Sequence, residues 1–483
     1  MQEKYRLLAE KAQAWVEAHK AEFVSEIQGM ARIPSVSRED LAQPGAPFGP
    51  ECRKMLDYAL ERGRCYGFDV QDYDGYAGAI SMGDPENALG VVAHLDVVPV
   101  GEGWIYPPFG ATYLPDQDAL VGRGVDDNKG PAVAALFAMR ILRELNWPLK
   151  HGVVLLCGLS EEAGMADMKA LVERGISFPK TSLVPDGGYP VNYGQKGSLG
   201  AEISAECAGN LIQLDAGTAR NVIPDRAEAV LAVEEAEVKA ALQRLPGEMV
   251  QDLEVCPCPE GTRLVAKGRA GHAAFPDGSV NAIQRLARVL SESGLLKGSC
   301  AQALRNLAEL SADAHGISVG AEYSDQESGA LTLVYSVVHL QSGRIKVQVD
   351  CRYPITCDGE ALKARVRAAW ADRGFEAERL SLSKPFYIPK EDPRVRALQG
   401  VYRALTGRDD PPYTMGGGTY SRVVPNAITF GAGIPESGRV RDFLPEGHGG
   451  AHAKDEALVM EKAYRCAQIY AVALAVLDEV LAE

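Results

Sequence analysis

Hydrophobic runs alternate with amphipathic stretches over residues 1–198 of this 483-residue chain. Hydrophobic runs at 89–93, 153–159 and 182–184 are typical of buried strands, and the periodic apolar stretch 132–145 is typical of a helix. Strand and helix patterns that alternate in this way predict an α/β fold with a mostly parallel central sheet.

The pattern changes near residue 199 and returns after residue 384. The middle part predicts an α+β domain with strands at 199–207, 227–233, 262–267, 331–340 and 344–351, and helices at 281–292, 301–314 and 359–371. The last part predicts a helix at 394–405, a strand at 427–430 and a final helix from Lys454. We therefore expect an α/β domain in two parts, 1–198 and 385–483, interrupted by an α+β insert at 199–384.

Composition narrows the class of protein. Apolar residues make up 46% of the chain and charged residues 24%, as in globular enzymes. A net charge of −15 argues against nucleic acid and anionic membranes as partners. No apolar run approaches the length of a membrane span, and residues 1–30 are typical of a charged amphipathic helix. The ten cysteines show no disulfide-like spacing, and Cys256 and Cys258 are expected to be free thiols, so we expect a cytoplasmic protein.

Acidic residues and histidines stand where the hydrophobic runs end, and these positions are His94, Asp127, Glu161, Glu162, Asp186 and His452. A single acid at a strand end is usually a helix cap or part of a solvated turn. Several of them at the carboxyl edge of one α/β sheet instead predict a site for two divalent metals that share a carboxylate. Asp96, two residues after His94, lies on the same side of an extended chain and is expected to accept a hydrogen bond from the His94 ring.

Short motifs along nearly the whole chain resemble the M20 family of dinuclear metallopeptidases, and within it the dipeptidases of the PepV type, which include Sapep-like members. The motifs include His94-Leu-Asp96, Gly122-Arg-Gly-Val-Asp-Asp-Asn-Lys-Gly130, Glu161-Glu162, Asn221-Val-Ile-Pro-Asp225, Gly271-His-Ala-Ala-Phe-Pro276, Asp350-Cys-Arg-Tyr-Pro354, Gly416-Gly-Gly-Thr-Tyr420 and His452-Ala-Lys-Asp-Glu456. Each string is weak alone, but together they follow the family's order.

The resemblance implies roles in the metal site. Asp127 would bridge the two ions, His94 and Asp186 would complete one site, and Glu162 and His452 the other. Glu161 would be the general base for a water between the ions. Zinc is the favoured metal, with manganese or cobalt as alternatives. The family pattern also implies a cis peptide bond between Asp127 and Asn128; Asp126 is the alternative bridging residue.

The resemblance makes the insert a lid domain with residues that contact the substrate. His272 would stabilise the oxyanion, and Asn221 would hold the substrate backbone. Arg352 fits a bidentate carboxylate clamp. The turn that contains Gly417 and Thr419 could bring N–H groups to the substrate's terminal carboxylate. Glycines on both sides place His448 in a loop, as a pocket residue.

The implied activity is hydrolysis of dipeptides with a free N-terminus. An N-acyl or N-carbamoyl amidohydrolase and a carboxypeptidase are alternatives with the same metals, and a binding module without activity is a third. The insert between Leu199 and Ser383 is longer than a simple dimerisation lid requires, and the extra segment is expected around 291–326. In PepV-like members such an insert occupies the partner's place, so we expect a monomer.

Overall fold

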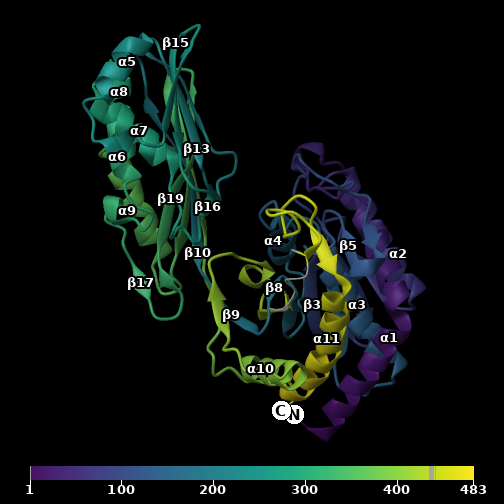
Figure 1. The fold of residues 1–483 in the computed structure, drawn as a ribbon. Helices are drawn as coiled ribbons and strands as arrows, with labels where there is room; N and C mark the ends of the chain where they lie inside the picture. Colours follow the sequence, from purple (N-terminus) through teal and green to yellow (C-terminus); the bar gives the residue numbers. More distant parts are fainter. Residues whose placement is uncertain (1, 434–439, 441, 483) are drawn as a thin grey trace. The chain divides into compact units, whose positions relative to one another are not determined.

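The computed structural model describes residues 2–433, 440 and 442–482, and the chain divides into two compact units (Figure 1). Unit 1 comprises Met1–Tyr193, Ile388–Tyr413 and Thr419–Glu483, and unit 2 comprises Gly194–Tyr387 and Thr414–Gly418. The sequence pattern predicted domain boundaries between residues 198 and 199 and between residues 384 and 385. It did not predict that the short segment Thr414–Gly418 belongs to unit 2.

A mixed sheet forms the centre of unit 1. Its strands run in the order β1 (Asp69–Asp72), β2 (Ala77–Met82), β6 (Gly152–Gly158), β3 (Ala88–His94), β7 (Ser182–Val184), β24 (Ala427–Phe430) and β9 (Val191–Gln195). The pairs β6–β3, β3–β7 and β7–β24 are parallel, and the outer pairs are antiparallel. Every residue of β3 and β6 is buried, as expected for parallel strands that are covered on both faces.

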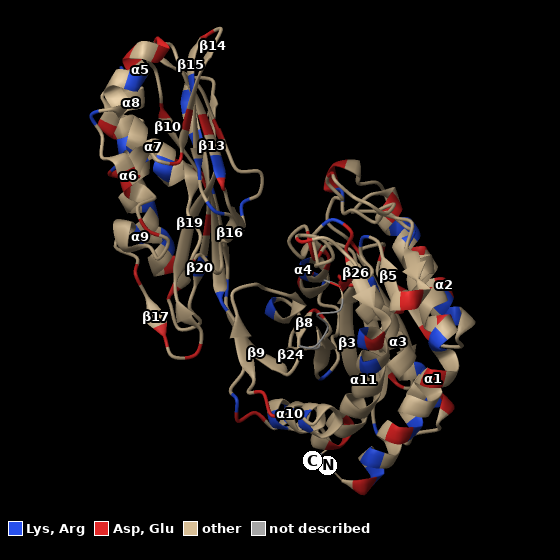
Figure 2. Cartoon of the chain, viewed as in Figure 1, with Lys and Arg blue, Asp and Glu red and all other residues tan. Residues whose placement is uncertain are grey.

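Helices cover this sheet. On one face lie α1 (Glu3–Ala31), α2 (Pro50–Cys65), α3 (Lys129–Glu144), α10 (Pro393–Thr406) and α11 (Met460–Val480), and α4 (Ala166–Glu173) packs on the other. The final helix begins at Met460 and not at Lys454. The reason is that Ala457–Val459 forms strand β26, which pairs with β5 (Ala119–Val121) beside β4 (Thr112–Leu114). Charges of both signs are mixed along α1 and α2 (Figure 2).

Unit 2 is built on an antiparallel sheet of eight strands. Their order is β14 (Leu253–Cys258), β15 (Gly261–Lys267), β13 (Arg226–Leu231), β11 (Leu211–Ala216), β19 (Thr332–Gln341), β20 (Arg344–Tyr353), β10 (Gly197–Glu206) and β21 (Glu376–Ser383). The helices α5 (Glu235–Leu242), α6 (Gly247–Val250), α7 (Ala282–Ser293), α8 (Ser299–Leu310) and α9 (Gly359–Ala371) cover one face of this sheet (Figure 1). The strands predicted at 331–340 and 344–351 are β19 and β20, which form a hairpin with Ser342 and Gly343 in the left-handed region.

Short strands complete the two units. Unit 1 holds the pair β8 (Gly187–Gly188) and β25 (Ala432–Gly433), and unit 2 holds β12 (Val222–Ile223) with β16 (Gly271–His272) and β17 (Ser324–Asp325) with β18 (Gly329–Ala330). The strands β22 (Phe386–Tyr387) and β23 (Tyr413–Met415) lie where the chain passes between units.

The cysteines differ in part from the expectation. Cys207, after β10, and Cys300, in the first turn of α8, are joined by a disulfide that sequence spacing did not reveal. Residues 93 positions apart in the chain meet here because α8 packs against β10. Cys256 and Cys258 are free thiols, as predicted. In the described part of the chain, no helix has the length and apolar character needed to cross a membrane.

Candidate metal centre

Three neighbouring strands of unit 1 deliver the predicted side chains to one edge of the sheet. His94 is the last residue of β3, Glu161 and Glu162 follow β6, and Asp186 follows β7. Because β3 runs parallel to both β6 and β7, their carboxyl ends meet at the same edge. This is the arrangement that the hydrophobic pattern predicted.

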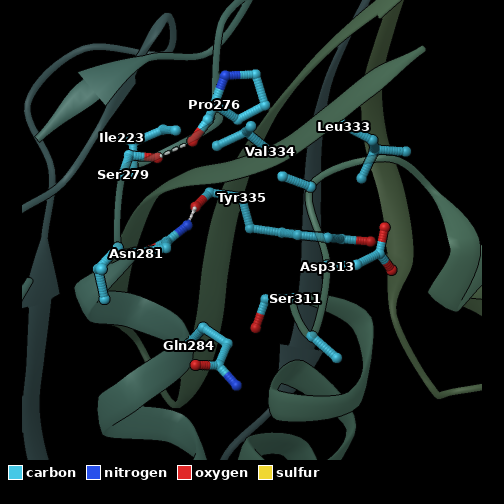
Figure 3. Close-up of a pocket in the computed structure, with 13 residues that line it drawn as sticks. Ile223, Pro276, Ser279, Asn281, Gln284, Ser311, Asp313, Leu333, Val334 and Tyr335 are labelled. Atoms are coloured by element: carbon cyan, nitrogen blue, oxygen red, sulfur yellow. Dashed lines mark hydrogen bonds between the residues drawn. The ribbon is translucent and has the colours of Figure 1, made fainter. Parts of the chain in front are cut away.

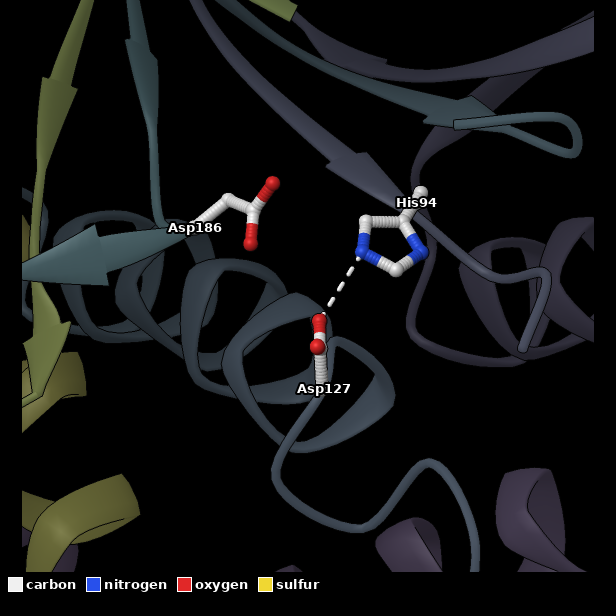
Figure 4. A group of neighbouring side chains, drawn as sticks. All are labelled: His94, Asp127 and Asp186. Carbon is white, nitrogen blue, oxygen red and sulfur yellow. Dashed lines mark hydrogen bonds and ion pairs between the residues drawn. The ribbon is translucent and has the colours of Figure 1, made fainter. Parts of the chain in front are cut away.

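Two ligand groups share Asp127, which lies just before α3. One group contains His94, Asp127 and Asp186 (Figure 4), and the other contains Asp127, Glu162 and His452. In each group the candidate ligand atoms lie within 4.8 Å of one another. Asp127 turns Oδ1 to His94 Nε2 and Oδ2 to His452 Nε2, each at 3.1 Å. Glu162 Oε1 lies 2.8 Å from the same His452 nitrogen.

The local backbone fixes how Asp127 is presented. The peptide bond between Asp127 and Asn128 is cis, as the resemblance implied. The Asn128 side chain donates a 2.7 Å hydrogen bond to the Pro185 carbonyl, next to Asp186. The alternative bridging residue, Asp126, is instead paired with Lys462. Asp127 is therefore the carboxylate that both ligand groups share.

Asp96 differs in detail from the sequence expectation. His94 Nδ1 donates to the Asp96 backbone carbonyl at 3.0 Å, whereas the nearer carboxylate oxygen lies at 3.5 Å. The Asp96 carboxylate accepts the backbone N–H groups of Glu161 at 3.0 Å and Glu162 at 3.1 Å. Asp96 thus holds the backbone of both glutamates, and its main chain sets the orientation of the His94 ring.

Two buried acids near His452 anchor the loops that carry the ligands. Glu456 accepts hydrogen bonds from Arg123, from Gly124 N–H, and from the N–H groups of Asp126 and Asp127. Asp455 accepts the N–H groups of Ile105 and Tyr106 and a hydrogen bond from His448 Nδ1. His448 is therefore engaged by Asp455, and it belongs to neither ligand group. The sequence contained these acids as Asp455-Glu456 but gave no signal for their partners.

The concentration of buried acidic groups in this cluster favours a bound cation. Burial and the neighbouring Asp127 charge raise the pKa of Asp186 to about 7. Burial, with the Asp186 charge, also raises the pKa of Glu161 well above its ordinary value. Hydrogen bonds to Asp127 and Glu162 raise the pKa of His452 to about 10. Buried carboxylates in such numbers repel one another, and the imidazole and carboxylate donors suit zinc, manganese or cobalt.

The remaining predicted site residues fall in different places. Asn221, His272, Arg352 and Gly417 belong to unit 2, whereas Thr419 belongs to unit 1. Thr419 is only 3% exposed, and its hydroxyl contacts Thr429 and caps the turn that follows. Arg352 is paired with Asp350 through Nε and Nη2, so the edge expected to clamp a carboxylate is already engaged, while Nη1 lies 3.5 Å from the Gly416 carbonyl.

His272 is placed on the short strand β16. Val222 is its partner across the β12–β16 pair, and Asn221, the residue before β12, accepts the N–H of Ala273 at its carbonyl. Nδ1 of His272 accepts the N–H of Ala274 at 3.1 Å. An imidazole that accepts at Nδ1 carries its hydrogen on Nε2. His272 therefore presents Nε2–H as a donor.

A cavity of about 240 Å³ lies inside unit 2, between β19 and α7 (Figure 3). Its polar groups serve the fold. Asn281 donates to the Tyr335 carbonyl, and the Ser279 hydroxyl donates to the Pro276 carbonyl. Asp313 accepts three backbone N–H groups. This cavity contains none of the predicted site residues.

The sequence model of Peptidase family M20/M25/M40 matches residues 90–475, which include all the candidate metal ligands. The chain belongs to this peptidase family. The Bacillus subtilis protein YtjP, which carries the name of a dipeptidase, is 29% identical over 466 residues, which cover 94% of this chain and 97% of YtjP.

Two solved structures share the fold across almost the whole chain. Dug1p, a di-peptidase of Saccharomyces cerevisiae, has a TM-score of 0.60 and 14% identity, with 98% of each chain covered. Human carnosine dipeptidase 1 has a TM-score of 0.57 and 17% identity, with 98% of this chain and all of that chain covered. The M20 peptidase fold, an α/β metal-binding domain with an inserted α+β domain, is therefore that of this protein.

Proposed function

We propose that this protein is a dinuclear metallo-dipeptidase that hydrolyses the peptide bond of dipeptides with a free N-terminus. The observation that carries the proposal is the pair of ligand groups that share Asp127, with Glu161 held beside them. Relatives of nearly the same length from Bacillus subtilis and Staphylococcus epidermidis carry dipeptidase names, which supports this substrate class.

The ligand residues would hold one divalent ion through His94, Asp127 and Asp186, and a second through Asp127, Glu162 and His452. Ions held there supply Lewis acidity, which polarises a carbonyl and makes water acidic near neutral pH. Zinc is the metal we propose, since two histidines and carboxylates form the donor set.

Glu161 is proposed as the general base. Its backbone is fixed by Asp96, and it belongs to neither ligand group, so its carboxylate is available to take a proton from water. The same carboxyl then returns the proton to the nitrogen of the leaving amine. Glu162, the next residue, turns its carboxylate to His452 instead.

The residues of unit 2 are proposed to bind the substrate. The Nε2–H of His272 suits the oxyanion that forms on the carbonyl, a donor that is typically worth about 3 kcal/mol in the transition state. Asn221, Arg352 and the Gly416–Gly417 backbone would hold the substrate main chain and its C-terminal carboxylate. With Nε and Nη2 held by Asp350, Arg352 would present Nη1 to that carboxylate.

The test is hydrolysis by protein stripped with a chelator, with zinc, manganese or cobalt restored separately. The panel contains free dipeptides, tripeptides, N-acetyl amino acids and N-blocked dipeptides. We expect restored cleavage of free dipeptides alone. Cleavage of only N-acyl or N-blocked substrates would move the protein to the amidohydrolases. Silence on every substrate with metal bound would contradict an enzymatic role.

We further propose a monomer in the cytoplasm. Segment 291–326 runs from the end of α7 through α8 to β17, and α8 packs into the core of unit 2, which supports the monomer. Eight free thiols support a reducing compartment, whereas the Cys207–Cys300 bond is typical of oxidising ones. Sedimentation of the purified protein tests the first proposal, and fractionation of cells tests the second.

A further inference from the structure

A second cavity in unit 2, of about 440 Å³, lies beside the residues proposed to bind the substrate. It is lined by four stretches of unit 2 and by Lys196. The stretches are 274–277 after His272, His315 after α8, 328–330 at β18 with Thr332, and 414–416. The cavity therefore lies wholly within unit 2.

The walls of this cavity are continuous with the proposed substrate contacts. Ala274, whose N–H bonds to His272, lines it, and so does Gly416, whose carbonyl faces Arg352. A Cβ added to Gly416 would lie 2.8 Å from the Ala274 Cβ, so these two walls are in close contact. Phe275 forms an apolar wall and is 70% exposed.

The cavity also contains a buried positive charge. Lys196 is only 8% exposed, and its ammonium group donates to the Ala330 carbonyl. Burial lowers the pKa of Lys196, and the charge of Asp325 opposes this effect. The Asp325 carboxylate accepts hydrogen bonds from the N–H and hydroxyl groups of Ser328 and Thr356. An anion bound in the cavity would therefore offset the burial of the lysine charge.

One polar group of the cavity wall, the Thr332 hydroxyl, suits a carboxylate. His315 lies between the Leu331 carbonyl and the Asp277 carboxylate, and Asp277 itself is largely exposed. Thr332 is 3% exposed, lines the cavity, and its hydroxyl has no hydrogen-bond partner. A buried hydroxyl without a partner is uncommon in folded proteins and marks a place where a ligand can complete the hydrogen bonding.

We propose that this cavity binds the side chain of the substrate's C-terminal residue and that Lys196 selects an acidic one, aspartate or glutamate. The proposal rests on the proposed dipeptidase function. The side chain and the carboxylate of a C-terminal residue leave the same Cα. A carboxylate held near Arg352 and Gly417 therefore places its side chain at the cavity wall formed by Gly416. The stem of a glutamate would pack on Phe275, with its carboxylate at Lys196.

The test compares kcat/KM for alanyl-glutamate with that for alanyl-glutamine, which has the same shape without the charge. We expect the wild-type protein to favour alanyl-glutamate by about tenfold or more, since close charge pairs at buried sites couple by at least about 1.5 kcal/mol. This comparison needs no variant. Equal rates, or a preference for glutamyl-alanine over alanyl-glutamate, would overturn the proposal. Failure to cleave any of the three and other free dipeptides would instead contradict the proposed function.

Variants assign the preference to one side chain. Lys196→Met should reduce the ratio of the two kcat/KM values to about one, mainly through a higher KM for alanyl-glutamate. Lys196→Arg should keep part of the preference because it keeps the charge. Lys239→Met, on an exposed face of α5, is the matched control and should leave the ratio unchanged. A preference that persists in folded Lys196→Met would also overturn the proposal.

Discussion

Arg123 and Glu456 form an ion pair that is sealed from solvent, with 2.7 Å between Nη1 and Oε2 and side-chain exposures of 1% and 0%. The same carboxylate also accepts the N–H groups of Asp126 and Asp127. One acid near the C-terminus therefore holds the backbone of the carboxylate that both ligand groups share.

Glu456→Ala should destabilise the protein by about 3–5 kcal/mol, because it leaves the buried Arg123 charge without its carboxylate. Glu456→Gln should cost less, since its amide oxygen can still accept N–H groups. Unfolding in urea at about pH 8 measures this, because burial raises the pKa of Glu456 to about 7. Asp40→Ala, which breaks the exposed Arg38–Asp40 pair, is the control and should cost less than about 1 kcal/mol. Unchanged unfolding of Glu456→Ala would show that the pair contributes nothing.

Asp96→Asn should lower metal affinity or kcat/KM by about ten- to a hundredfold. An asparagine can accept only one of the two N–H groups of Glu161 and Glu162, because its NH2 group would face the other. Metal content and steady-state kinetics measure the effect. Asp84→Asn, which alters an exposed cap of a short turn, should leave both at the wild-type value. Full activity in Asp96→Asn would mean that the glutamates need no such support.

Glu161→Gln should keep both metals and lose about a hundred- to ten-thousandfold in kcat, because it removes a proton acceptor and not a ligand. Glu162→Gln should instead lose metal. Elemental analysis of each purified variant, together with its kcat, separates the two roles. The opposite pattern would exchange the assignments of the two glutamates.

Asp167 should make folding stability depend on pH. Burial raises its pKa to about 6 in the folded protein, so the folded state holds the proton that the unfolded chain releases near pH 4. Its contribution is present below the unfolded pKa and is lost as pH rises through about 6.

The free energy of unfolding of the wild type, relative to Asp167→Asn, should therefore fall by up to about 3 kcal/mol between pH 4 and pH 6.5. Asparagine can keep the hydrogen bonds from the N–H groups of Leu159 and Ser160. A pH-independent difference in stability between the two proteins does not affect the predicted change with pH. Urea unfolding at several pH values measures the slope. A flat or rising difference would contradict the assigned pKa.

Much of the candidate site followed from local sequence. His94 and Asp186 stand at the ends of hydrophobic runs, and parallel pairing of those runs brings such ends together whatever the rest of the chain does. The assignment of Glu161 as the base and Glu162 as a metal ligand had no such basis and came from the family resemblance alone. Which Asp96 oxygen meets His94 Nδ1 depends on the backbone conformation after β3, which periodicity does not reveal.

Features that depend on distant parts of the chain could not be predicted. Strand β26 is too short to show a pattern, and its partner β5 lies more than three hundred residues earlier. The Cys207–Cys300 bond and the Arg352–Asp350 pair likewise depend on tertiary packing and on side-chain conformations. Thr414–Gly418 lies in a part of the sequence that otherwise belongs to unit 1. It contacts unit 2, because the Lys196 N–H donates to the Met415 carbonyl and the Thr414 hydroxyl donates to the Glu327 carbonyl.

That last segment limits how unit 2 can be exchanged between proteins. Residues 194–387 taken alone would lack the five residues 414–418, which supply one wall of the cavity and cover Ala274. A chimera that exchanges only residues 194–387 would combine a foreign insert with the native segment 414–418, and the two would no longer be complementary. Substrate preference in this protein should therefore be transplanted as two pieces of sequence, and natural recombination at a single pair of breakpoints would tend to yield enzymes with altered selectivity.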